Sequence, residues 1–342
     1  MKNYSFKTLS FLFFTSFFIF FSCADSASGR VEEKLSASTK KVNLKVTNWN
    51  VKTFFDSVND GNEYDEFLSS EKWGKSAYEE RIKRLCSVIK ALDSDVFVME
   101  EIENKGVLYD ISNFLSGEWN SRKVYSYSAF AKDEASCIGC AVLSRFPLEN
   151  MSLASLDIRT DGQMPKMRPI IRLEVVRGKK SLTLLVNHWK SMSGGLEETE
   201  VWRNRQEALL SSIVATCLEN GECLLAAGDF NRDIKNFFYD KKSGQILLRT
   251  FENASMQDYG VFVNSPWFTS GGSLVKPGSY YFDGEWSRID NFFYAGDCKL
   301  LSFLPETEGD WCAEEDFIPK DYKVFSGQGY SDHLPVSCVI EF

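Results

Sequence analysis

The chain has 342 residues, of which 44% are hydrophobic and 25% are charged. This composition is typical of a folded globular protein and excludes a disordered or fibrous chain. The net charge of −9 excludes steering onto nucleic acid by overall charge, so a phosphate-bearing substrate would need a local basic patch or a bound cation.

The N-terminus has the features of an export signal. Lys2 and Lys7 precede the apolar stretch Leu9–Phe21, and small residues follow it. As a helix this stretch would rise about 20 Å, which is too short to span a hydrocarbon core of about 30 Å. We therefore interpret residues 1–22 as a signal peptide that directs the protein out of the cytoplasm.

Cys23 follows a small residue and resembles the acylated cysteine of a bacterial lipoprotein, which predicts a lipid anchor at the cell envelope. Ordinary cleavage after Ala24 is the alternative, because Ser22 and Ala24 suit a small-x-small site, and it would release the protein. The segment after Cys23 has one valine, one leucine and no aromatic residue, so we predict a flexible tether over residues 23–41.

Eight further cysteines follow, an even number in a chain predicted to enter an oxidising compartment, so disulfides are plausible. Cys137 and Cys140 have the spacing of a zinc or redox pair, but no second pair or histidine stands near them in the sequence. A loop disulfide or free thiols are favoured over zinc. The close spacings 217/223 and 298/312 are the other candidate pairs.

The remaining residues, 42–342, are interpreted as one folded domain. Alternating apolar and polar residues predict a strand at 42–51, helical spacing predicts helices at 76–92 and about 197–218, and an apolar run predicts a strand at 95–100. Further apolar runs predict strands at 139–143, 170–176, 182–186, 223–227, 288–294 and 336–340. Many short strands with few helices indicate a mixed sheet or sandwich flanked by helices.

Polar residues that could perform chemistry follow these apolar runs at six places: Asn48–Asn50, Glu100–Asn104, Asn187–Ser191, Gly228–Asn231, Arg288–Asp290 and Ser331–His333. Taken singly, each is explained as well by an Asx turn or a loop cap. Such residues are costly to bury unpaired, however, and both histidines of the chain, His188 and His333, fall within the set. Together the six segments predict one shared cleft at the edge of a sheet.

These segments in this order resemble the endonuclease/exonuclease/phosphatase superfamily, in which deoxyribonuclease I is the best known member. The matching motifs run from Asn48 to His333 and include Gly-Asp-Phe-Asn at 228–231 and Ser-Asp-His at 331–333. The resemblance implies an α+β fold with four layers, in which two mainly antiparallel sheets are packed together and flanked by helices. It also implies a divalent-metal-dependent phosphoesterase.

The resemblance assigns roles residue by residue. Glu101, joined by Asn50 and Asp332, corresponds to the metal site, and these oxygen ligands suit Mg²⁺, or Mn²⁺, better than Zn²⁺. Asp229 and Asn231 correspond to the pair that positions the attacking water and a phosphoryl oxygen. The remaining assignments are His188 as a phosphate contact, His333 as general base or acid, Asp290 as the carboxylate that orients His333, and Arg168 as a phosphate contact or a surface strand charge.

The sequence departs from the family at Glu100, where glutamine usually precedes the metal-binding glutamate. A second carboxylate beside Glu101 would either tighten metal binding or point to the other face of the strand, since neighbouring side chains alternate. We favour the second alternative, because the two carboxylates cannot easily share one ion.

The family includes nucleases, sphingomyelinases, inositol-polyphosphate phosphatases and inactive modules, so the fold alone does not choose a substrate. Arg288–Asp290 resembles the nuclease form. Tyr281 and Trp286, with Tyr280, are predicted to stack on bases, and a hairpin packed on the sheet is the alternative. A basic rim is predicted from some of the five cations Lys52, Lys190, Arg203, Arg205 and Arg232, about half of which we expect to be ordinary solvated charges.

A sphingomyelinase would expose an apolar hairpin, for which Ser265–Phe268 is the candidate, although its aromatic residues more often pack inward. We therefore predict an exported, lipid-anchored, Mg²⁺-dependent phosphodiesterase. We expect it to be an endonuclease for extracellular DNA or RNA that acts as a monomer without an obligate protein partner. A sphingomyelinase, a phosphomonoesterase and a non-catalytic surface binding module are the alternatives.

Overall fold

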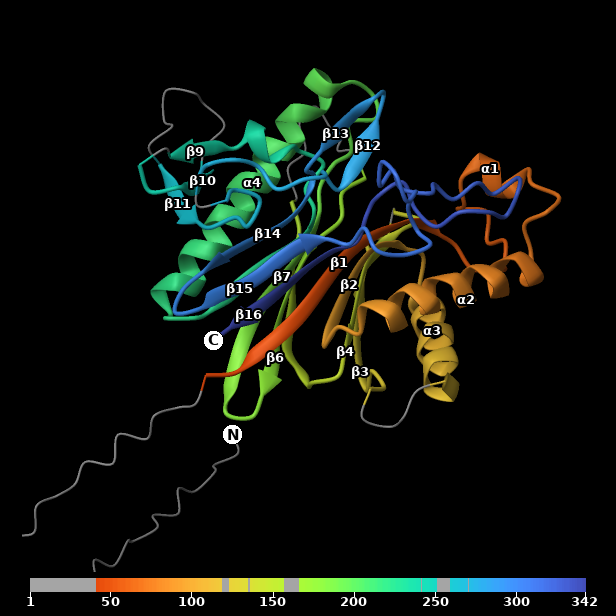
Figure 1. Cartoon of the computed structure of the whole chain (residues 1–342), viewed down its shortest axis with the longest axis horizontal. Helices are drawn as coiled ribbons and strands as arrows, with labels where there is room; N and C mark the ends of the chain where they lie inside the picture. Colours follow the sequence, from red (N-terminus) through yellow and green to blue (C-terminus); the bar gives the residue numbers. More distant parts are fainter. Residues whose placement is uncertain are drawn as a thin grey trace, which may run out of the picture. The chain divides into compact units, whose positions relative to one another are not determined.

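Two sheets packed face to face form the centre of the protein in the computed structural model, which describes residues 41–118, 123–134, 136–156, 166–240, 242–250, 259–269 and 271–342 (Figure 1). The predicted signal peptide, Cys23 and all of the tether except Lys41 lie outside these residues. Within the described part, no helix is both long and apolar enough to cross a membrane.

The first sheet has six strands in the order β15 (Lys299–Pro305), β16 (Val336–Glu341), β1 (Asn43–Phe54), β2 (Val96–Ile102), β4 (Gly139–Ser144) and β3 (Tyr127–Ala131). The second has five, in the order β14 (Asp290–Ala295), β8 (Leu224–Asp229), β7 (Lys180–His188), β6 (Ile170–Arg177) and β5 (Leu148–Ala154). Only β1 with β2 and β7 with β8 pair in parallel among these strands. The predicted pair of mainly antiparallel sheets is thus confirmed.

Helices cover the outer faces of both sheets and complete the four predicted layers (Figure 1). The helices α2 (Lys75–Leu92) and α3 (Lys105–Glu118) pack on the six-stranded sheet, where residues such as Ile82, Ile89 and Phe97 share one core. The helix α4 (Leu196–Glu219) contributes Leu210 and Val214 to the core that includes the five-stranded sheet. The predicted helix bounds agree with α2 and α4 to within a residue or two.

The smaller elements lie in the connections. They are α1 (Asp65–Leu68), the 3₁₀ turn η1 (Ile234–Asn236), the three-stranded sheet β9 (Phe238–Asp240), β10 (Gln245–Arg249) and β11 (Gly260–Val263), and the hairpin β12 (Tyr280–Phe282) and β13 (Glu285–Ser287). The three-stranded sheet packs against α4, and the hairpin directly precedes β14. All eight cysteines of the described part are free thiols, so the candidate pairs 217/223 and 298/312 are not formed.

The strand register places the polar segments together. His188 is the register partner of Asp229 at the ends of β7 and β8, and Asp229 is in turn the partner of Asp290 at the start of β14. In the other sheet, Asn50 on β1 pairs with Glu100 on β2. Because the two sheets face each other, these strand ends meet at one edge of the sandwich, as the sequence predicted.

Candidate active site

The strand ends surround a cavity of about 610 Å³. Its walls come from both sheets, from the end of the loop before β16, which contains Asp332 and His333, and from the loops that carry Tyr64 and Ser191. The lining includes these predicted site residues: Asn50, Glu101, Asp229, Asn231, Asp332 and His333. The structure therefore brings both predicted metal-binding carboxylates and one of the two histidines to a single solvent-accessible pocket.

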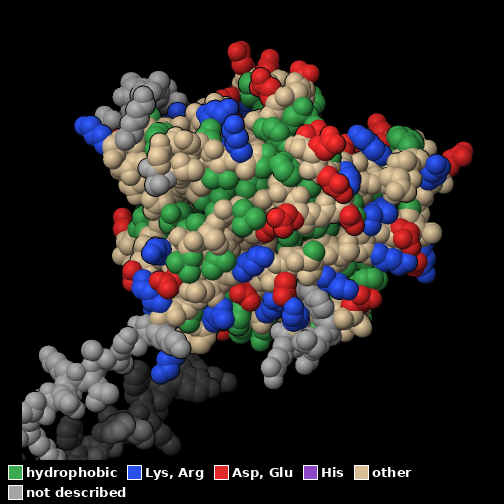
Figure 2. All heavy atoms as spheres, in the orientation of Figure 1, with side chains coloured by type: hydrophobic (Ala, Val, Ile, Leu, Met, Phe, Trp, Pro, Cys, Tyr) green, Lys and Arg blue, Asp and Glu red, His purple; other side chains and the backbone are tan. Residues whose placement is uncertain are grey.

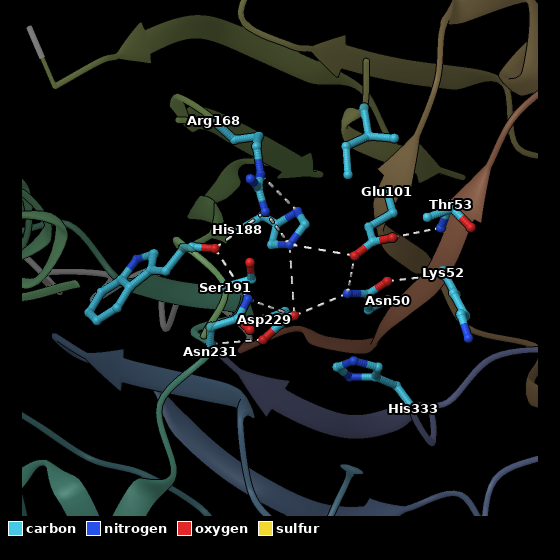
Figure 3. A network of polar contacts seen from close by, with 12 residues as sticks. Asn50, Lys52, Thr53, Glu101, Arg168, His188, Ser191, Asp229, Asn231 and His333 are labelled. Carbon is cyan, nitrogen blue, oxygen red and sulfur yellow. Dashed lines mark hydrogen bonds and ion pairs between the residues drawn. The ribbon is translucent and has the colours of Figure 1, made fainter. Parts of the chain in front are cut away.

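An amide links two carboxylates at the centre of this pocket (Figure 3). Asn50 Nδ2 donates a hydrogen bond to Glu101 Oε1 at 3.1 Å and another to Asp229 Oδ2 at 3.0 Å. The second oxygen of Glu101 accepts the backbone N–H of Thr53 at 2.6 Å. The contacts fix the orientation of both carboxylates, which would otherwise repel each other in a buried position.

The backbone at Glu101 is in the left-handed region, with φ of 66°. The register of β2 against β4 shifts between Glu100 and Ile102, so Glu101 lies in a β-bulge that turns its side chain into the cavity. Such a conformation costs energy for a residue with a Cβ and is often found where a side chain must be aimed at a functional site. The alternation argument did not foresee this bulge.

Glu100 does not line the cavity. It lies between the sheets with its side chain fully buried, on the same face of β2 as Val96 and Val98, and neither of its carboxylate oxygens has a hydrogen-bond partner. Burial, with Asp290 and Asp229 nearby, raises the pKa of Glu100 well above its usual value. The expectation that the two glutamates do not share one ion agrees with this placement.

His333 is held by Asp290, whose Oδ2 lies 2.8 Å from Nδ1 of the imidazole. Burial lowers the pKa of His333, but the carboxylates of Asp290, Asp229 and Asp332 outweigh it, so the pKa lies well above the usual value. The backbone is also anchored, since Trp49 donates its indole N–H to the His333 carbonyl at 2.9 Å. Asp290 thus orients His333, and the surrounding carboxylates favour its protonated form.

His188 has the opposite environment. Its Nε2 lies 3.8 Å from both Glu101 Oε1 and Asp229 Oδ2, yet burial and the neighbouring Arg168 hold its pKa well below the usual value. Arg168 Nε lies 3.2 Å from Nδ1 of the ring and Arg168 Nη2 lies 2.6 Å from Nε2. The guanidinium therefore contacts both ring nitrogens at once (Figure 3), which favours neutral imidazole.

Asp229 and Asn231 form a tight turn after β8. The Asn231 backbone N–H and its side-chain amide both donate to the Asp229 carboxylate, at 2.8 and 3.1 Å, and Asn231 has a positive φ of 46°. The pKa of Asp229 is raised to about 7, mainly because the side chain is buried and also because Asp290 lies near it. A carboxylate with this pKa can exchange a proton near neutral pH.

The donor set fits a hard divalent cation. Glu101, Asp229 and Asp332 present carboxylates to the cavity, and Lys52 lies 3.9 Å from Asp332 but also forms an ion pair with Asp321. Oxygen ligands are those that Mg²⁺ and Mn²⁺ prefer. Asn50 directs its N–H₂ group at the carboxylates and its oxygen at the Lys52 N–H, at 3.0 Å, so in this arrangement it holds the acidic ligands in place.

A second acidic group, formed by Asp60, Glu63 and Glu103, lies in and beside the loop after β1 and is separate from the predicted metal residues. Its oxygens accept backbone N–H groups of that loop: Glu63 bonds Asp60 and Gly61, and Glu103 bonds Asp56. These contacts give the carboxylates a role in shaping the loop.

The predicted basic rim is wrong for two of its residues. Arg203 and Arg232 are buried and form ion pairs with Glu200, and Arg232 also pairs with Glu207 at 2.6 Å. Lys190 is partly exposed and donates to the Ser191 and Ser193 carbonyls that border the cavity. Positive and negative side chains are interspersed over the face seen in Figure 2. Of the predicted cations, Lys52 lines the cavity and Lys190 contacts residues that border it.

Of the three aromatic residues predicted to stack on bases, the β12/β13 hairpin presents only Tyr280 to the cavity. Tyr281 and Trp286 are register partners on one face of the hairpin, with ring centroids 5.2 Å apart, and Trp286 packs against the core under α2 and α3. Tyr280 lines the cavity on the other face. Because side chains alternate along a strand, the sequence predicts that Tyr280 and Tyr281 lie on opposite faces of the hairpin. It does not predict which of the two faces meets the site.

Other contributors were not predicted. Tyr64 reaches the cavity from the loop before α1, and no motif in the sequence marks it. Trp267, within the segment considered as a lipid-binding hairpin, is fully buried and donates its indole N–H to the Asp290 carbonyl at 2.8 Å. That segment therefore supports the site from inside the protein and does not present this tryptophan to a membrane.

Comparisons with known proteins agree with the geometry. A family model described as Endonuclease/Exonuclease/phosphatase family matches residues 45–341. Among solved structures, truncated Caenorhabditis elegans TDP2 has a TM-score of 0.56 at 15% identity and covers 87% of this chain and 97% of its own.

Two further structures have similar folds. TDP2 of D. rerio complexed with single strand DNA product has a TM-score of 0.52 at 15% identity, covering 87% of this chain and 98% of its own. An endonuclease/exonuclease/phosphatase family protein from Bacteroides thetaiotaomicron has a TM-score of 0.52 at 15% identity, and the match covers 89% of this chain and 99% of its own. At these identities the likeness concerns the fold. No curated protein sequence matches the chain.

Proposed function

Since the chain belongs to the endonuclease/exonuclease/phosphatase family, a superfamily of phosphoester hydrolases, we propose that it is a metal-dependent phosphodiesterase that cleaves DNA or RNA internally. The observation that carries the proposal is that His333, Glu101, Asp229 and Asp332 line one cavity, with His188 buried behind it, 3.8 Å from Glu101 and Asp229. These groups supply what attack of water on phosphorus requires: a proton acceptor, a proton donor and positive charge for the phosphoryl oxygens.

The pKa directions divide the proton transfers between two residues. Asp229, with a pKa of about 7, takes the proton of the attacking water as the new P–O bond forms. His333, whose neighbouring carboxylates raise its pKa and favour the protonated ring, gives its proton to the leaving oxygen as the old P–O bond breaks. Asp290 fixes the imidazole so that Nε2 carries this proton.

Positive and hydrogen-bonding groups on the far side of the carboxylates are proposed to contact the phosphoryl oxygens. Arg168 and neutral His188 lie together there, and the Asn231 amide is held by Asp229 and the Trp189 carbonyl. Glu101 and Asp332, with Asn50 beside them, would hold a Mg²⁺ or Mn²⁺ ion, which neutralises charge on the phosphate when bound.

Nucleic acid is favoured over the other phosphoesters by two observations. Tyr280 places an aromatic ring in the cavity wall, with its centroid 4.8 Å from that of His333, and base stacking on aromatic rings is common in single-strand binding. A structure similar in fold, TDP2 of D. rerio, is described with a single strand DNA product. The segment considered for lipid insertion, by contrast, packs its tryptophan inward.

The proposal includes location. Export by residues 1–22, and attachment through lipid on Cys23, would place the cavity outside the cytoplasm, where the substrates are extracellular DNA and RNA. The protein is proposed to act as a monomer.

The test is hydrolysis by the purified protein of plasmid DNA, single-stranded DNA, RNA, sphingomyelin and a phosphomonoester, each with Mg²⁺ and with chelator. We expect metal-dependent cleavage of nucleic acid, internal cuts included, and loss of cleavage in His188→Ala. Turnover of sphingomyelin or of the monoester, with nucleic acid left intact, would overturn the proposed substrate.

A second test titrates Mg²⁺. Glu101→Gln is expected to raise the Mg²⁺ concentration that gives half-maximal activity by about tenfold, or about 1.4 kcal/mol, and an unchanged midpoint would place the ion elsewhere.

A further inference from the structure

The β12/β13 hairpin beside His333 is built as a rigid support. Its turn consists of Asp283 and Gly284, both with positive φ, at 48° and 82°, as a two-residue hairpin of type I′ requires. At its base, Tyr280 forms a backbone bridge with His333, and the Leu334 N–H donates to the Ser279 carbonyl at 2.7 Å. The hairpin position is therefore fixed relative to the histidine.

One face of this hairpin carries a row of rings that leads out of the cavity. The Tyr280 ring lies against His333, and the Phe282 ring is parallel to that of Tyr280, with an interplanar angle of 11° and centroids 6.3 Å apart. Phe282 has 69% of its surface exposed, the highest fraction among the large hydrophobic residues of the described part. A phenylalanine this exposed on a hairpin buries little apolar surface, so it contributes little to the stability of the fold.

We infer that Tyr280 and Phe282 form a stacking surface for the nucleobase next to the scissile phosphate, with Phe282 determining how tightly that nucleotide is held. The inference rests on the proposed function. A phosphate bound in the cavity beside His333 would have its neighbouring sugar and base next to Tyr280, which lines the cavity wall, and Phe282 lies beyond Tyr280 on the same hairpin face, exposed to solvent. The flat, parallel rings match the flat face that every base presents, so the surface is tolerant of sequence.

The opposite face of the hairpin shows that the two aromatic pairs have different tasks. Tyr281 and Trp286 contact each other, and Trp286 packs on the core under α2 and α3, so this pair attaches the hairpin to the protein. Tyr280 and Phe282 remain directed at the cavity and the solvent. An aromatic face can also bind a quaternary ammonium group, which the experiment distinguishes from a base.

The test measures kcat and KM of the purified protein with Mg²⁺ on two single-stranded oligonucleotides, one normal and one with an abasic residue next to the cleaved linkage. Phe282→Ala is expected to raise KM for the normal oligonucleotide roughly 5- to 150-fold, the range of one lost base stack, with the effect absent on the abasic oligonucleotide. Phe282→Trp should restore the wild-type KM. Phe262→Ala, at an exposed phenylalanine of β11, is the matched control and should leave both substrates unaffected.

The outcomes separate the two proposals. Suppose that the wild-type protein cleaves the oligonucleotides. If Phe282→Ala then has the wild-type KM on both substrates, or if its KM rises equally on both, base stacking by Phe282 is overturned and the nuclease proposal stands. If wild-type protein cleaves plasmid DNA but neither oligonucleotide, the stacking surface for a single-stranded base is overturned; if it cleaves no nucleic acid at all, the proposed function itself fails. If Phe282→Ala loses only turnover of sphingomyelin, the aromatic surface serves a quaternary ammonium group and the inference is wrong.

Discussion

The two histidines occupy the same site but opposite environments. His333 lies on the segment before β16 with a carboxylate on its ring, and its pKa is raised. His188 ends β7 with a guanidinium against its ring, and its pKa is lowered. Both side chains are buried, so burial, which lowers the pKa of a histidine, acts on each, and the charge of the nearest neighbour decides the outcome.

This difference shows how one pocket obtains two functions from one residue type. Asp290 makes His333 a proton donor, whereas Arg168 keeps His188 neutral and adds a positive charge beside it. The predictions below test the division from its largest expected effect to its smallest.

Removal of either imidazole should have the largest effect. We expect His333→Ala and His188→Ala each to lower kcat on oligonucleotide by about 10² to 10⁴, because a positioned proton donor or phosphate contact contributes on this scale. The measurement is steady-state cleavage, with circular dichroism to show that each variant is folded. Near-normal turnover in either variant would remove that histidine from the mechanism.

Removal of the carboxylate behind His333 should cost less. Asp290→Asn keeps the shape of the side chain but removes the charge that raises the pKa of His333, and we expect activity to fall about 10- to 100-fold. Asp297→Asn, at an exposed aspartate just beyond β14, is the matched control. Equal activity of the two variants would show that Asp290 has no role in proton transfer.

On the other side, Arg168→Met should lower kcat/KM by about tenfold, as expected when one charge-assisted hydrogen bond of about 1.5 kcal/mol is lost. Arg168→Lys should retain part of the activity, because it keeps the positive charge beside His188. If methionine and lysine are equally damaging, the planar guanidinium rather than its charge is what His188 requires.

The smallest expected effect is the difference in pKa between the two imidazoles, which NMR measures directly. In metal-free protein, NMR titration of the two imidazoles should give a pKa above 6.5 for His333 and below 6.5 for His188. Since the folded pKa of His333 exceeds the unfolded value, its pairing stabilises the fold below about pH 6.5, and this contribution is lost as the pH rises through the folded pKa. Asp290→Asn should lower the His333 value, and titration of both rings at one pH would contradict the division.

Local patterns were sufficient to predict much of the fold. The helix spacing of Ile82, Leu85 and Ile89 and the apolar runs that became β4, β6, β7, β8, β14 and β16 are properties of short segments. The polar residues at the strand ends predicted a shared site because unpaired polar groups are rarely buried separately. The roles assigned to these residues by resemblance stay predictions until they are tested.

What the sequence did not predict depends on distant contacts. The burial of Arg232, which follows β8, depends on Glu200 and Glu207 being turned toward it by the packing of α4. The bulge at Glu101 depends on the register of β2 against β4, and the choice between Tyr281 and Tyr280 depends on where the hairpin docks. None of these contacts has a signature within a few residues of the chain.

The most direct test of the central claim is single-turnover cleavage of a labelled single-stranded oligonucleotide by the purified protein and by the His188→Ala/His333→Ala double variant, each with Mg²⁺ and with chelator. We expect internal cleavage only by the wild-type protein and only with Mg²⁺. Cleavage by the double variant at the wild-type rate, or undiminished cleavage with chelator, would contradict a metal-dependent nuclease site built on these two histidines.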